Sequence, residues 1–421
     1  MTEPLFSTVS VIGLGYIGLP TAAVLASRGI IVRGVDINAQ AVDTINSGGI
    51  HIVEPELDIL VRAAVQTGTL TASLTPSPAD AFLVAVPTPF TEGHAPDVSY
   101  VKAAALAIAP VLQHGNLVIL ESTSPVGTTE QMAQWLAEAR PDLTFPQTAG
   151  DGADIRIAYC PERVLPGRVI HELVSNDRVI GGMSTACAAR AKQLYQIFVR
   201  GECITTTART AEMCKLTENA FRFVNIAFAN ELSMICDQLN IDVWELIRLA
   251  NRHPRVNVLQ PGPGVGGHCI AVDPWFIVHS APDISPLLRA AGAVNHTKPE
   301  WVKAKVMAMV EQFTKPVVTV ACLGVAFKAD IDDLRESPSL EIVEQLAGNP
   351  RLKLVVNEPN ITQLPAHVAA LGVTLAPLNE ALAQADMVLL LVDHAPYKKM
   401  DWSTVRVPVL DTKGVLPSRR G

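Results

Sequence analysis

Thr-Val-Ser-Val-Ile-Gly-Leu-Gly-Tyr-Ile-Gly occupies residues 8–18 of this 421-residue chain. Its first five residues form an apolar run typical of a buried strand, residues 19–27 favour a helix, and a second apolar run over 31–35 ends at Asp36. Glycines spaced Gly-x-Gly-x-x-Gly between a strand and a helix, with an acid about twenty residues on, are the fingerprint of a dinucleotide-binding unit. The sequence therefore predicts a Rossmann-like α/β domain here.

Each position of this fingerprint has a physical task. Gly13 makes the tight turn, Gly15 lets the pyrophosphate approach, and Gly18 lets the helix pack against the strand, with the helix N-terminus facing the phosphates. Asp36 is placed to bind the ribose 2′-hydroxyl and to repel a 2′-phosphate, which predicts NAD rather than NADP as the cofactor. The predicted cofactor contacts in this unit are Gly13, Gly15, Tyr16, Ile17, Gly18 and Asp36.

Two further strands of the predicted sheet end in segments rich in hydroxyl groups and proline. The strand over 81–86 runs into Thr88, and the strand over 117–120 runs into a segment that contains Thr123 and Thr129. Because ligands bind at the carboxyl ends of strands in open α/β sheets, these threonines are predicted to touch the cofactor. Ordinary capping and turn formation is the alternative.

A strand over 155–159 is followed by a loop that carries charge. Glu162, Arg163 and Arg168 lie within this loop, next to Val164. One acid and two arginines at a strand end are predicted to orient a phosphorylated substrate. Loop charges in solvent are the alternative.

The middle of the chain predicts one long helix over 207–239, a stretch without proline or glycine. Lys215, Asn219 and Arg222 fall at i, i+4 and i+7, on one face of this helix. A lysine in a dry site can act as acid or base, and an asparagine amide can donate to a developing oxyanion. A solvated polar face is the alternative. A helix of this length is also a plausible dimer surface.

Four glycines within residues 262–267 precede Cys269 and Asp273. Glycines let a backbone approach a ligand closely, and a thiol followed by an acid suggests covalent catalysis. A Gly/Pro loop beside a buried, inert cysteine is the alternative. Just upstream, Arg252, His253 and Arg255 supply positive charge after a predicted helix over 244–250.

The last part of the chain repeats a βαβαβ pattern. Its predicted strands are 317–323, 352–356, 387–392 and 407–410, with a helix over 339–346, and helices over 287–294 and 299–313 precede them. The three-glycine fingerprint is missing, so a second dinucleotide is not expected to bind in the same way. Lys328 and Arg335, near the carboxyl end of the first of these strands, fit a nucleotide diphosphate.

Together these patterns predict an α/β protein with two doubly wound Rossmann-like domains joined by a long central helix. The predicted division is 1–205 for an NAD-binding domain, 206–312 for a central helical and dimerisation region with the catalytic loop, and 313–421 for a C-terminal Rossmann-like domain that fits a nucleotide diphosphate.

Composition narrows the classes of partner. Apolar residues make up 49% of the chain and charged residues 18%, and no apolar run approaches the roughly 18 residues of a membrane span. The net charge of −8 argues against nucleic acid or an anionic membrane as a partner. Seven cysteines at irregular spacings, with no Cys-x-x-Cys pair, argue against a disulfide framework and against a cysteine-based metal site. A reducing, cytoplasmic location is therefore expected.

The chain resembles the UDP-glucose/GDP-mannose dehydrogenase family over nearly its whole length. The resemblance rests on G-L-G-Y-I-G-L-P, V-P-T-P, E-S-T-S-P-V-G-T-T, A-E-M-C-K-L-T-E-N, G-P-G-V-G-G-H-C, and G-V-A-F-K followed by D-D-L-R-E-S-P. It implies a homodimer formed by the long helix and a C-terminal domain, 313–421, that binds a UDP-sugar. It also implies four-electron oxidation of the C6 alcohol of a nucleotide sugar to a carboxylate, with two NAD.

Within the family the chain is most similar to enzymes that act on UDP-N-acetyl-D-mannosamine. The similarity lies in Y-C-P-E-R-V-L-P-G at 159–167, N-R-H-P-R at 251–255 and H-C-I-A-V-D at 268–273. The UDP-glucose enzymes carry a lysine where this chain has Val272 and a second glutamate where it has Pro166. Both departures argue against glucose as the sugar, and the second removes one candidate acid for activating water.

The resemblance also implies residue roles. A Cys269 thiolate adds to the C6 aldehyde, Lys215 and Asn219 stabilise the oxyanion, and Asp273 orients Lys215 or the hydrolytic water. The implied catalytic residues are Cys269, Lys215, Asn219, Asp273 and Glu162. The implied substrate contacts are Arg163, Val164, Lys215, Asn219, Arg222, His253, Arg255, Gly266, Phe327, Lys328 and Arg335, and Lys328 also reaches the cofactor.

Two alternatives come from other classes of protein. A two-electron hydroxyacid dehydrogenase shares the first domain and a helical lysine but has no need of Cys269. A non-catalytic sensor of NAD or of nucleotide sugars has no use for Cys269, Lys215 and Asn219. The yield of NADH per substrate separates the three: two, one or none.

Overall fold

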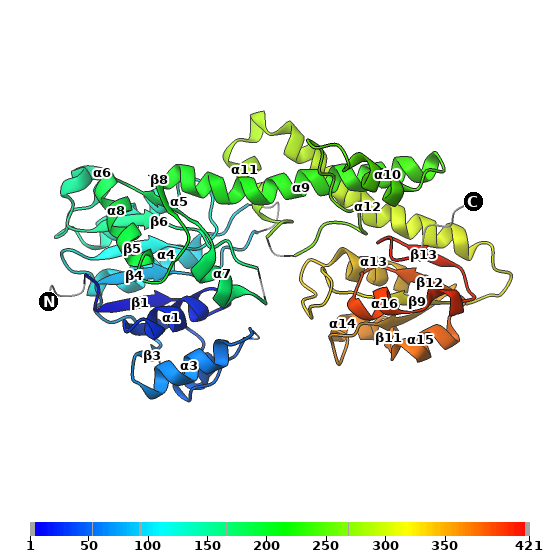
Figure 1. Ribbon diagram of the computed structural model, residues 1–421, viewed down its shortest axis with the longest axis horizontal. Coiled ribbons are helices and arrows are strands. Elements are labelled where there is room, and N and C mark those ends of the chain that lie inside the picture. The colour runs from blue at the N-terminus through cyan, green and yellow to red at the C-terminus, as the bar shows by residue number, and fades with distance from the viewer. Residues whose placement is uncertain (1–4, 53, 92–94, 166, 268, 417–421) are drawn as a thin grey trace. The chain divides into compact units, whose positions relative to one another are not determined.

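The computed structural model describes residues 5–52, 54–91, 95–165, 167–267 and 269–416 (Figure 1). The chain divides into two compact units. The first unit comprises Met1–Glu218 and Trp275–Ser280, and the second comprises Asn219–Pro274 and Ala281–Gly421. Each unit is built around one sheet, which confirms the predicted α/β class with two Rossmann-like domains.

The first unit contains an eight-stranded sheet in the order β3-β2-β1-β4-β5-β6-β7-β8. All neighbouring strands are parallel except β6 and β7, which pair antiparallel. Its first six strands have the order of a dinucleotide-binding fold. The strands are β1 (Thr8–Ile12), β2 (Ile31–Val35), β3 (Leu70–Ser73), β4 (Ala81–Val84), β5 (Leu117–Leu120), β6 (Arg156–Tyr159), β7 (Arg178–Gly182) and β8 (Cys203–Thr207).

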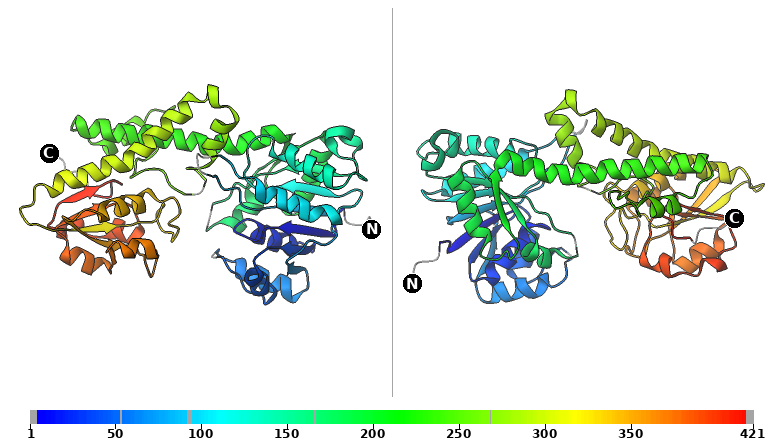
Figure 2. Two further views of the ribbon diagram at one scale, coloured as in Figure 1. Left: turned by 180° about the vertical axis from the view of Figure 1, so that it is seen from behind. Right: turned by 45° about the horizontal axis from the view of Figure 1, so that its top comes forward.

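Helices cover both faces of this sheet (Figure 2). Val9 and Val11 of β1 belong to one buried cluster with α1, while Ile12 belongs to a second cluster with α4 and α5. A strand buried on both faces explains why 8–12 reads as a continuous apolar run. The helices are α1 (Gly18–Ser27), α2 (Ala39–Asn46), α3 (Leu57–Gln66), α4 (Ser99–Ile108), α5 (Thr128–Ala139), α6 (Pro146–Ala149), α7 (Val169–Ser175) and α8 (Thr185–Tyr195).

The predicted long helix is α9 (Ala208–Gln238), with 31 residues. It starts in the first unit and continues into the second. It is followed by α10 (Val243–Ala250), α11 (Asp273–Ser280) and α12 (Pro286–Val310).

The prediction of two separate helices over 287–294 and 299–313 was wrong, because α12 runs without a break through Pro299. An internal proline removes one helix hydrogen bond and costs about 3 kcal/mol. Val302, Val306 and Val310 of the same helix are fully buried in the core of the last domain. This packing outweighs the local cost, which the sequence pattern alone does not reveal.

The sheet of the second unit has five parallel strands in the order β11-β10-β9-β12-β13. This is the same winding as β3-β2-β1-β4-β5 in the first unit. Its strands are β9 (Val318–Leu323), β10 (Leu352–Asn357), β11 (Thr374–Leu375), β12 (Met387–Leu390) and β13 (Val409–Asp411), and its helices are α13 (Pro338–Ala347), α14 (Ala366–Ala370), α15 (Leu378–Gln384) and α16 (Ala395–Lys399).

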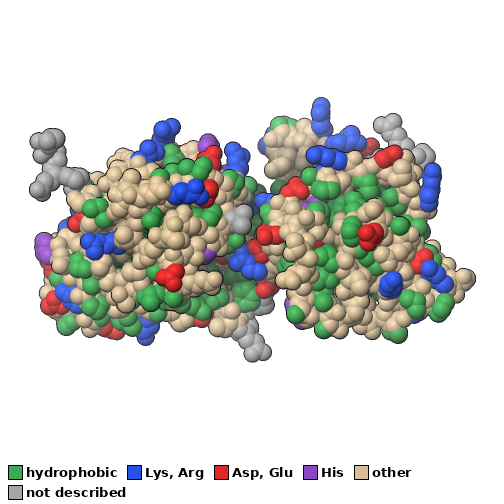
Figure 3. All heavy atoms as spheres, turned by 90° about the horizontal axis from the view of Figure 1, so that it is seen from below, with side chains coloured by type: hydrophobic (Ala, Val, Ile, Leu, Met, Phe, Trp, Pro, Cys, Tyr) green, Lys and Arg blue, Asp and Glu red, His purple; other side chains and the backbone are tan. Residues whose placement is uncertain are grey.

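The three-part division at 205 and 312 stays a prediction. Among the described residues, no helix is both long enough and apolar enough to cross a membrane. Acidic and basic side chains are interspersed over the face drawn in Figure 3.

Candidate active site

The turn after β1 has the geometry that a dinucleotide requires. Gly13 has φ +91°, its N–H donates to the Val35 carbonyl at 2.8 Å, and a side chain there would lie 2.6 Å from the Ala85 carbonyl oxygen. A side chain on Gly15, in contrast, would meet no protein atom within 4 Å. Gly13 is therefore required by the protein's own packing, whereas the space beside Gly15 is open to a ligand. These residues fit NAD.

Asp36, which directly follows β2, stabilises this turn through its carboxylate. One carboxylate oxygen accepts the N–H of Leu14 at 2.9 Å and the other accepts the N–H of Asn38 at 2.9 Å. The carboxylate remains half-buried, with lone pairs left for a ribose hydroxyl. The fingerprint predicted the ribose contact but not the support of the glycine turn. Tyr16 is exposed and Ile17 half-buried on the same turn.

The threonines predicted to touch the cofactor also have partners within the protein. Thr88 donates its hydroxyl to the carbonyl of Thr123, which links the loops after β4 and β5. Thr129 is fully buried and donates its hydroxyl to Glu212 of α9 at 2.6 Å. The same carboxylate accepts the N–H groups of Gly127 and Thr129, so it caps the start of α5. This arrangement favours the capping alternative for Thr129, and its contact with NAD stays a prediction.

The charges in the loop after β6 differ in burial: Glu162 is buried, Arg163 is half-buried and Arg168 is exposed. Glu162 accepts from Arg178 at 2.6 Å in a pair that is almost fully buried, and its other oxygen accepts the N–H of Arg163 at 2.6 Å. The Arg163 guanidinium pairs with Glu218 of α9 at 2.8 Å. Val164 packs half-buried against the core. A buried ion pair therefore holds Glu162 in this loop, whereas Arg168 fits the alternative of a loop charge in solvent.

A buried acid that the sequence did not single out lies behind this loop. Glu121, at the end of β5, accepts the hydroxyl of Tyr195 at 2.6 Å, and the Arg178 guanidinium lies 5.6 Å from the centre of the Tyr195 ring. Burial raises the pKa of Glu121 to about 7, and the nearby charge of Glu162 adds to the shift. Arg178 lies within a strand, where no motif marks it. Only the position of Glu121, directly after an apolar strand, hints at such a cluster.

The second unit brings three of the predicted catalytic residues together. Asn219 of α9 donates its side-chain amide to Asp273, and Arg222 donates to the amide oxygen of Asn219. Asn219 and Asp273 are both almost fully buried. The backbone N–H of Asp273 donates at 2.9 Å to the carbonyl of Cys269, whose side chain is half-buried. Cys269 therefore sits on a turn tied to Asp273, and Asp273 is tied to Asn219.

Lys215 lies on α9 one turn before Asn219 and is half-buried. The sequence predicted that Asp273 orients Lys215 or a water. The structure gives the Asp273 carboxylate a contact with Asn219, and its effect on Lys215 stays a prediction.

The glycines before Cys269 pack against the protein itself. Gly267 has φ +86°, and a side chain there would lie 2.7 Å from the Phe327 ring. A side chain on Gly264 would lie 2.7 Å from Pro338. Gly266 lies against the same loop. The close approach that these glycines allow is therefore, at least in part, an approach to the loop after β9.

The residues predicted to hold the nucleotide are mostly exposed. Lys328 is exposed after β9, and Arg335 is exposed with its guanidinium on both oxygens of Asp333, the shorter contact being 2.6 Å. His253 and Arg255 lie on the exposed turn after α10, where the His253 ring accepts the N–H of Arg255 at 3.3 Å. His268 and Pro166, both part of the resemblance, lie outside the described residues.

Family models match three successive parts of the chain. The NAD binding domain of the UDP-glucose/GDP-mannose dehydrogenase family matches residues 7–199, its central domain matches 209–297, and its UDP binding domain matches 321–419. The chain belongs to this family. The predicted resemblance, the NAD cofactor and the assignment as an NAD-dependent nucleotide-sugar dehydrogenase are confirmed.

Relatives within the dehydrogenase family are similar over the whole chain. An NDP-N-acetyl-D-galactosaminuronic acid dehydrogenase from Ralstonia nicotianae is 61% identical over 99% of this chain and 97% of its own. A UDP-N-acetyl-D-mannosamine dehydrogenase from Escherichia coli is 62% identical over 97% of this chain and 99% of its own. A solved UDP-D-ManNAc dehydrogenase from Pyrococcus horikoshii is 37% identical, covers 98% of this chain and 96% of its own, and has a TM-score of 0.87.

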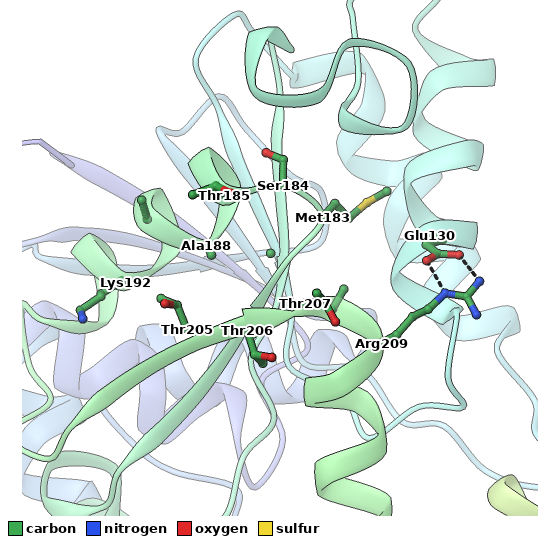
Figure 4. Close-up of a pocket in the computed structure, with 13 residues that line it drawn as sticks. Glu130, Met183, Ser184, Thr185, Ala188, Lys192, Thr205, Thr206, Thr207 and Arg209 are labelled. Carbon is green, nitrogen blue, oxygen red and sulfur yellow. Dashed lines mark hydrogen bonds and ion pairs between the residues drawn. The ribbon is translucent and has the colours of Figure 1, made fainter.

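One pocket of this dehydrogenase lies apart from the residues discussed so far (Figure 4). It has a volume of about 720 Å³ and lies among β7, β8 and the start of α8, with Lys192 and the hydroxyl groups of Ser184 and Thr205 in its lining. Arg209 at its edge is already paired with Glu130 through two contacts of 2.6 Å. None of the predicted site residues lines it, so we do not place the reaction there.

Proposed function

We propose that this dehydrogenase oxidises the C6 alcohol of a UDP-N-acetylhexosamine to the uronate, in two steps with two NAD and a covalent intermediate on Cys269. The observation that carries the proposal is the link from Cys269 to Asp273 and from Asp273 to Asn219 and Arg222. A two-electron dehydrogenase would have no need of a thiol on the turn whose backbone is tied to this buried polar cluster. UDP-N-acetyl-D-mannosamine is the sugar that we propose.

The reaction balances as follows. Removal of a hydride and a proton from the C6 alcohol gives an aldehyde, and NAD, when bound, accepts the hydride. The Cys269 thiolate adds to the aldehyde carbon and forms a thiohemiacetal. Loss of the hydroxyl proton and of a second hydride, which a second NAD would accept, converts the thiohemiacetal to a thioester. Water then cleaves the bond between sulfur and carbon, which releases the uronate and the thiol.

Asn219 has one amide hydrogen left for this chemistry. Its amide nitrogen carries two hydrogens, and Asp273 accepts one of them. Arg222 donates to the amide oxygen, which fixes the orientation of the amide. The second hydrogen is free to donate to an oxyanion on the sugar C6, since a fixed donor costs no reorganisation when charge develops. Lys215 is proposed to add its positive charge and to move protons.

Glu162 is proposed to act on the water step as an anion fixed in place. Its two oxygens accept from Arg178 and from the Arg163 backbone, but each carboxylate oxygen has a further lone pair. The buried Arg178 orients the carboxylate through this contact. We propose that the UDP group is bound by four basic residues, Arg163, Arg255, Lys328 and Arg335. Phe327 and Gly266 are proposed to contact the substrate as well.

We also propose a homodimer through the exposed face of α9. Phe221, Phe228 and Ile235 follow one another at seven-residue spacing, with 63%, 49% and 45% of their surface exposed, and Leu239 continues the row at 60%. An apolar stripe of this length on a surface helix is typical of an interface with another protein chain. We further propose a cytoplasmic location, where the Cys269 thiol stays reduced.

The sugar is tested by measuring kcat/KM for a panel of UDP-sugars with NAD. We expect UDP-N-acetyl-D-mannosamine to be preferred by at least about tenfold, which corresponds to about 1.4 kcal/mol in the transition state. The galacto epimer is the second candidate, because the Ralstonia nicotianae relative carries that configuration in its name. A preference for UDP-glucose would contradict the assignment of an N-acetylhexosamine. Oxidation of no UDP-sugar would contradict the proposed function itself.

A further inference from the structure

His394 is a fully buried histidine that the proposed reaction does not use. It follows β12 in the second unit, and none of its side chain is exposed. Its Nδ1 lies 2.9 Å from the backbone nitrogen of Asp330, and its Nε2 lies 3.0 Å from the Glu358 carboxylate. The side-chain nitrogen of Asn360 also lies 3.2 Å from Nδ1.

These contacts fix where the proton of the ring lies. A backbone N–H can only donate, so Nδ1 must accept from Asp330 and carries no hydrogen. The hydrogen is therefore on Nε2, which donates it to Glu358. The ring is a neutral imidazole with one task on each side: an acceptor for the loop after β9 and a donor to a buried acid.

Glu358 belongs to the same cluster and binds the first residues of the loop after β9. Its Oε2 accepts the backbone N–H groups of Val325 at 2.8 Å and of Ala326 at 3.1 Å. Burial alone would raise the pKa of Glu358, but the bonds from His394 and from the two N–H groups outweigh it and lower that pKa.

Asp330 holds the loop in a shape that needs support. It has φ +62°, which is costly for a residue with a side chain. Its N–H donates to His394, and its carboxylate accepts the N–H of Ala395 at 2.8 Å. This reciprocal pair of bonds fastens the loop to the residues after β12.

The loop held in this way, residues 325–337, carries the groups that the proposed function assigns to the nucleotide. Phe327 lies against Gly267, two residues before Cys269, and Lys328 is exposed between Phe327 and Asp330. We therefore expect a displacement of the Asp330 backbone to displace Lys328, which is two residues away. It would also alter the packing of Phe327 against the loop that carries Cys269.

We propose that His394 is a positioning residue for the nucleotide site, and that its Nδ1 acts by holding Asp330 and thereby the 325–337 loop. The proposal rests on the proposed function, because that function assigns UDP to this loop. It adds a residue that the proposed reaction itself does not use but on which UDP affinity depends.

Two substitutions separate the two sides of the ring. His394→Asn places an oxygen near the position of Nδ1, so it keeps the acceptor for Asp330 and loses the donor to Glu358. His394→Gln places an amide near the position of Nε2, so it keeps the donor to Glu358 and loses the acceptor for Asp330. His394→Asn loses the bond to Glu358, His394→Gln loses the bonds from Asp330 and Asn360, and both lose the contact between the ring and Tyr397. Thermal unfolding of both variants therefore measures the purely structural loss, and a merely structural role predicts that UDP affinity falls only in step with it.

The measurements are calorimetric titration of the full-length variants with UDP and with NADH, and amide hydrogen exchange over 325–337. We expect His394→Gln to weaken UDP binding at least tenfold and to speed exchange in the loop. His394→Asn should bind UDP within about threefold of the unmodified protein. NADH binding should be unchanged in both.

Equal UDP affinity in the two variants, whether both retained it or both lost it in step with thermal stability, would overturn the proposal. Faster exchange in His394→Gln without weaker UDP binding would also overturn it, since the loop would then be held for another purpose. If the unmodified protein does not bind UDP, the proposed function fails. The exchange data alone then decide whether Nδ1 of His394 holds the loop.

Discussion

The two sheets have the same strand order, and the turns after their first strands share a hydrogen bond. The acid that follows the second strand, however, has different surroundings in each unit. In the first unit the N–H of Gly13 donates to Val35, and Asp36 follows β2. In the second unit the N–H of Gly324 donates to Asn357 at 2.9 Å, and Glu358 follows β10. Each acid accepts backbone N–H groups of the turn after the first strand of its sheet.

The difference lies in what else each acid meets. Asp36 is half-buried and keeps room for a ribose, whereas the Glu358 carboxylate is fully buried against His394. Gly15 leaves open space after β1, whereas the loop after β9 carries Phe327. The same topology therefore leaves space for a dinucleotide in the first unit. In the second unit, buried hydrogen bonds to Glu358 and His394 hold the loop after β9. This is the physical reason why a second dinucleotide is not expected at the last domain.

The largest expected effect concerns Cys269, which belongs to the second unit. Cys269→Ser should lower uronate formation by roughly 10³-fold or more, because a serine hydroxyl is a poor nucleophile without a dedicated base. NAD binding, assigned to the first unit, should not change. Steady-state NADH formation and NADH titration measure the two quantities. Cys214→Ser, which alters another half-buried thiol, serves as the control. A near-normal rate in Cys269→Ser would make the cysteine structural.

Exchanging the two acids for alanine tests the comparison itself. Asp36→Ala should raise the KM for NAD by about tenfold or more and relax the preference over NADP, because the repulsion of a 2′-phosphate is lost. Glu358→Ala should leave the ratio of NAD to NADP use unchanged. It should lower the free energy of unfolding by about 2–4 kcal/mol, since His394 and two N–H groups lose a buried partner. Equal NAD and NADP use by the unmodified enzyme would contradict the role of Asp36.

Two glycine substitutions compare the open space beside Gly15 with the filled space beside Gly267. Gly15→Ala should change the free energy of unfolding by no more than about 0.5 kcal/mol, because the new methyl group meets no protein atom, yet it should weaken NAD binding. Gly267→Ala should cost about 1–3 kcal/mol, because φ +86° and the Phe327 ring both oppose a side chain. Thermal unfolding and NADH titration compare them. A stable Gly267→Ala variant with normal kcat would show that this packing is dispensable.

The smallest expected effect is a pair of opposite pH dependences. The pKa of Glu121 is raised from 4.5 to about 7 in the folded first unit. Its contribution to stability is therefore complete below about pH 4.5 and declines as the pH rises towards 7. The pKa of Glu358 is lowered, so its contribution is complete above about pH 4.5 and is lost as the pH falls through the folded value.

Thermal unfolding of Glu121→Gln and Glu358→Gln as a function of pH checks these signs. Glu121→Gln should flatten the decline between about pH 4.5 and 7, and Glu358→Gln should flatten the loss at acid pH. If Glu121→Gln left the slope between these values unchanged, the acid would not hold its proton in the folded protein.

Much of the fold was predictable because its signals are local. A run of five apolar residues and three spaced glycines specify the first turn, and the absence of glycine and proline over 207–239 specifies α9 to within one residue at each end. The continuity of α12 through Pro299 was not predictable, since it depends on valines that meet a core formed by residues far along the chain.

The site divides in the same way. Cys269, Asp273 and Asn219 stand in motifs and could be named from the sequence, but the bond between Asn219 and Asp273 was not predicted. The partners that hold the loops do not stand in motifs. Arg178 lies within a strand, Glu121 ends another, and His394 follows a third, so that only tertiary structure shows that they meet Glu162, Tyr195 and Asp330. Pairs of residues that are far apart in the chain have no characteristic sequence spacing, so their contacts cannot be predicted from a motif.

The number of NADH molecules formed per molecule of UDP-N-acetyl-D-mannosamine consumed tests the four-electron assignment most directly. A limiting amount of the sugar, incubated with excess NAD until absorbance is constant, should yield two NADH and one uronate without free aldehyde. A yield of one NADH with release of the aldehyde would contradict covalent capture by Cys269, and would reduce the protein to a two-electron dehydrogenase on the same fold.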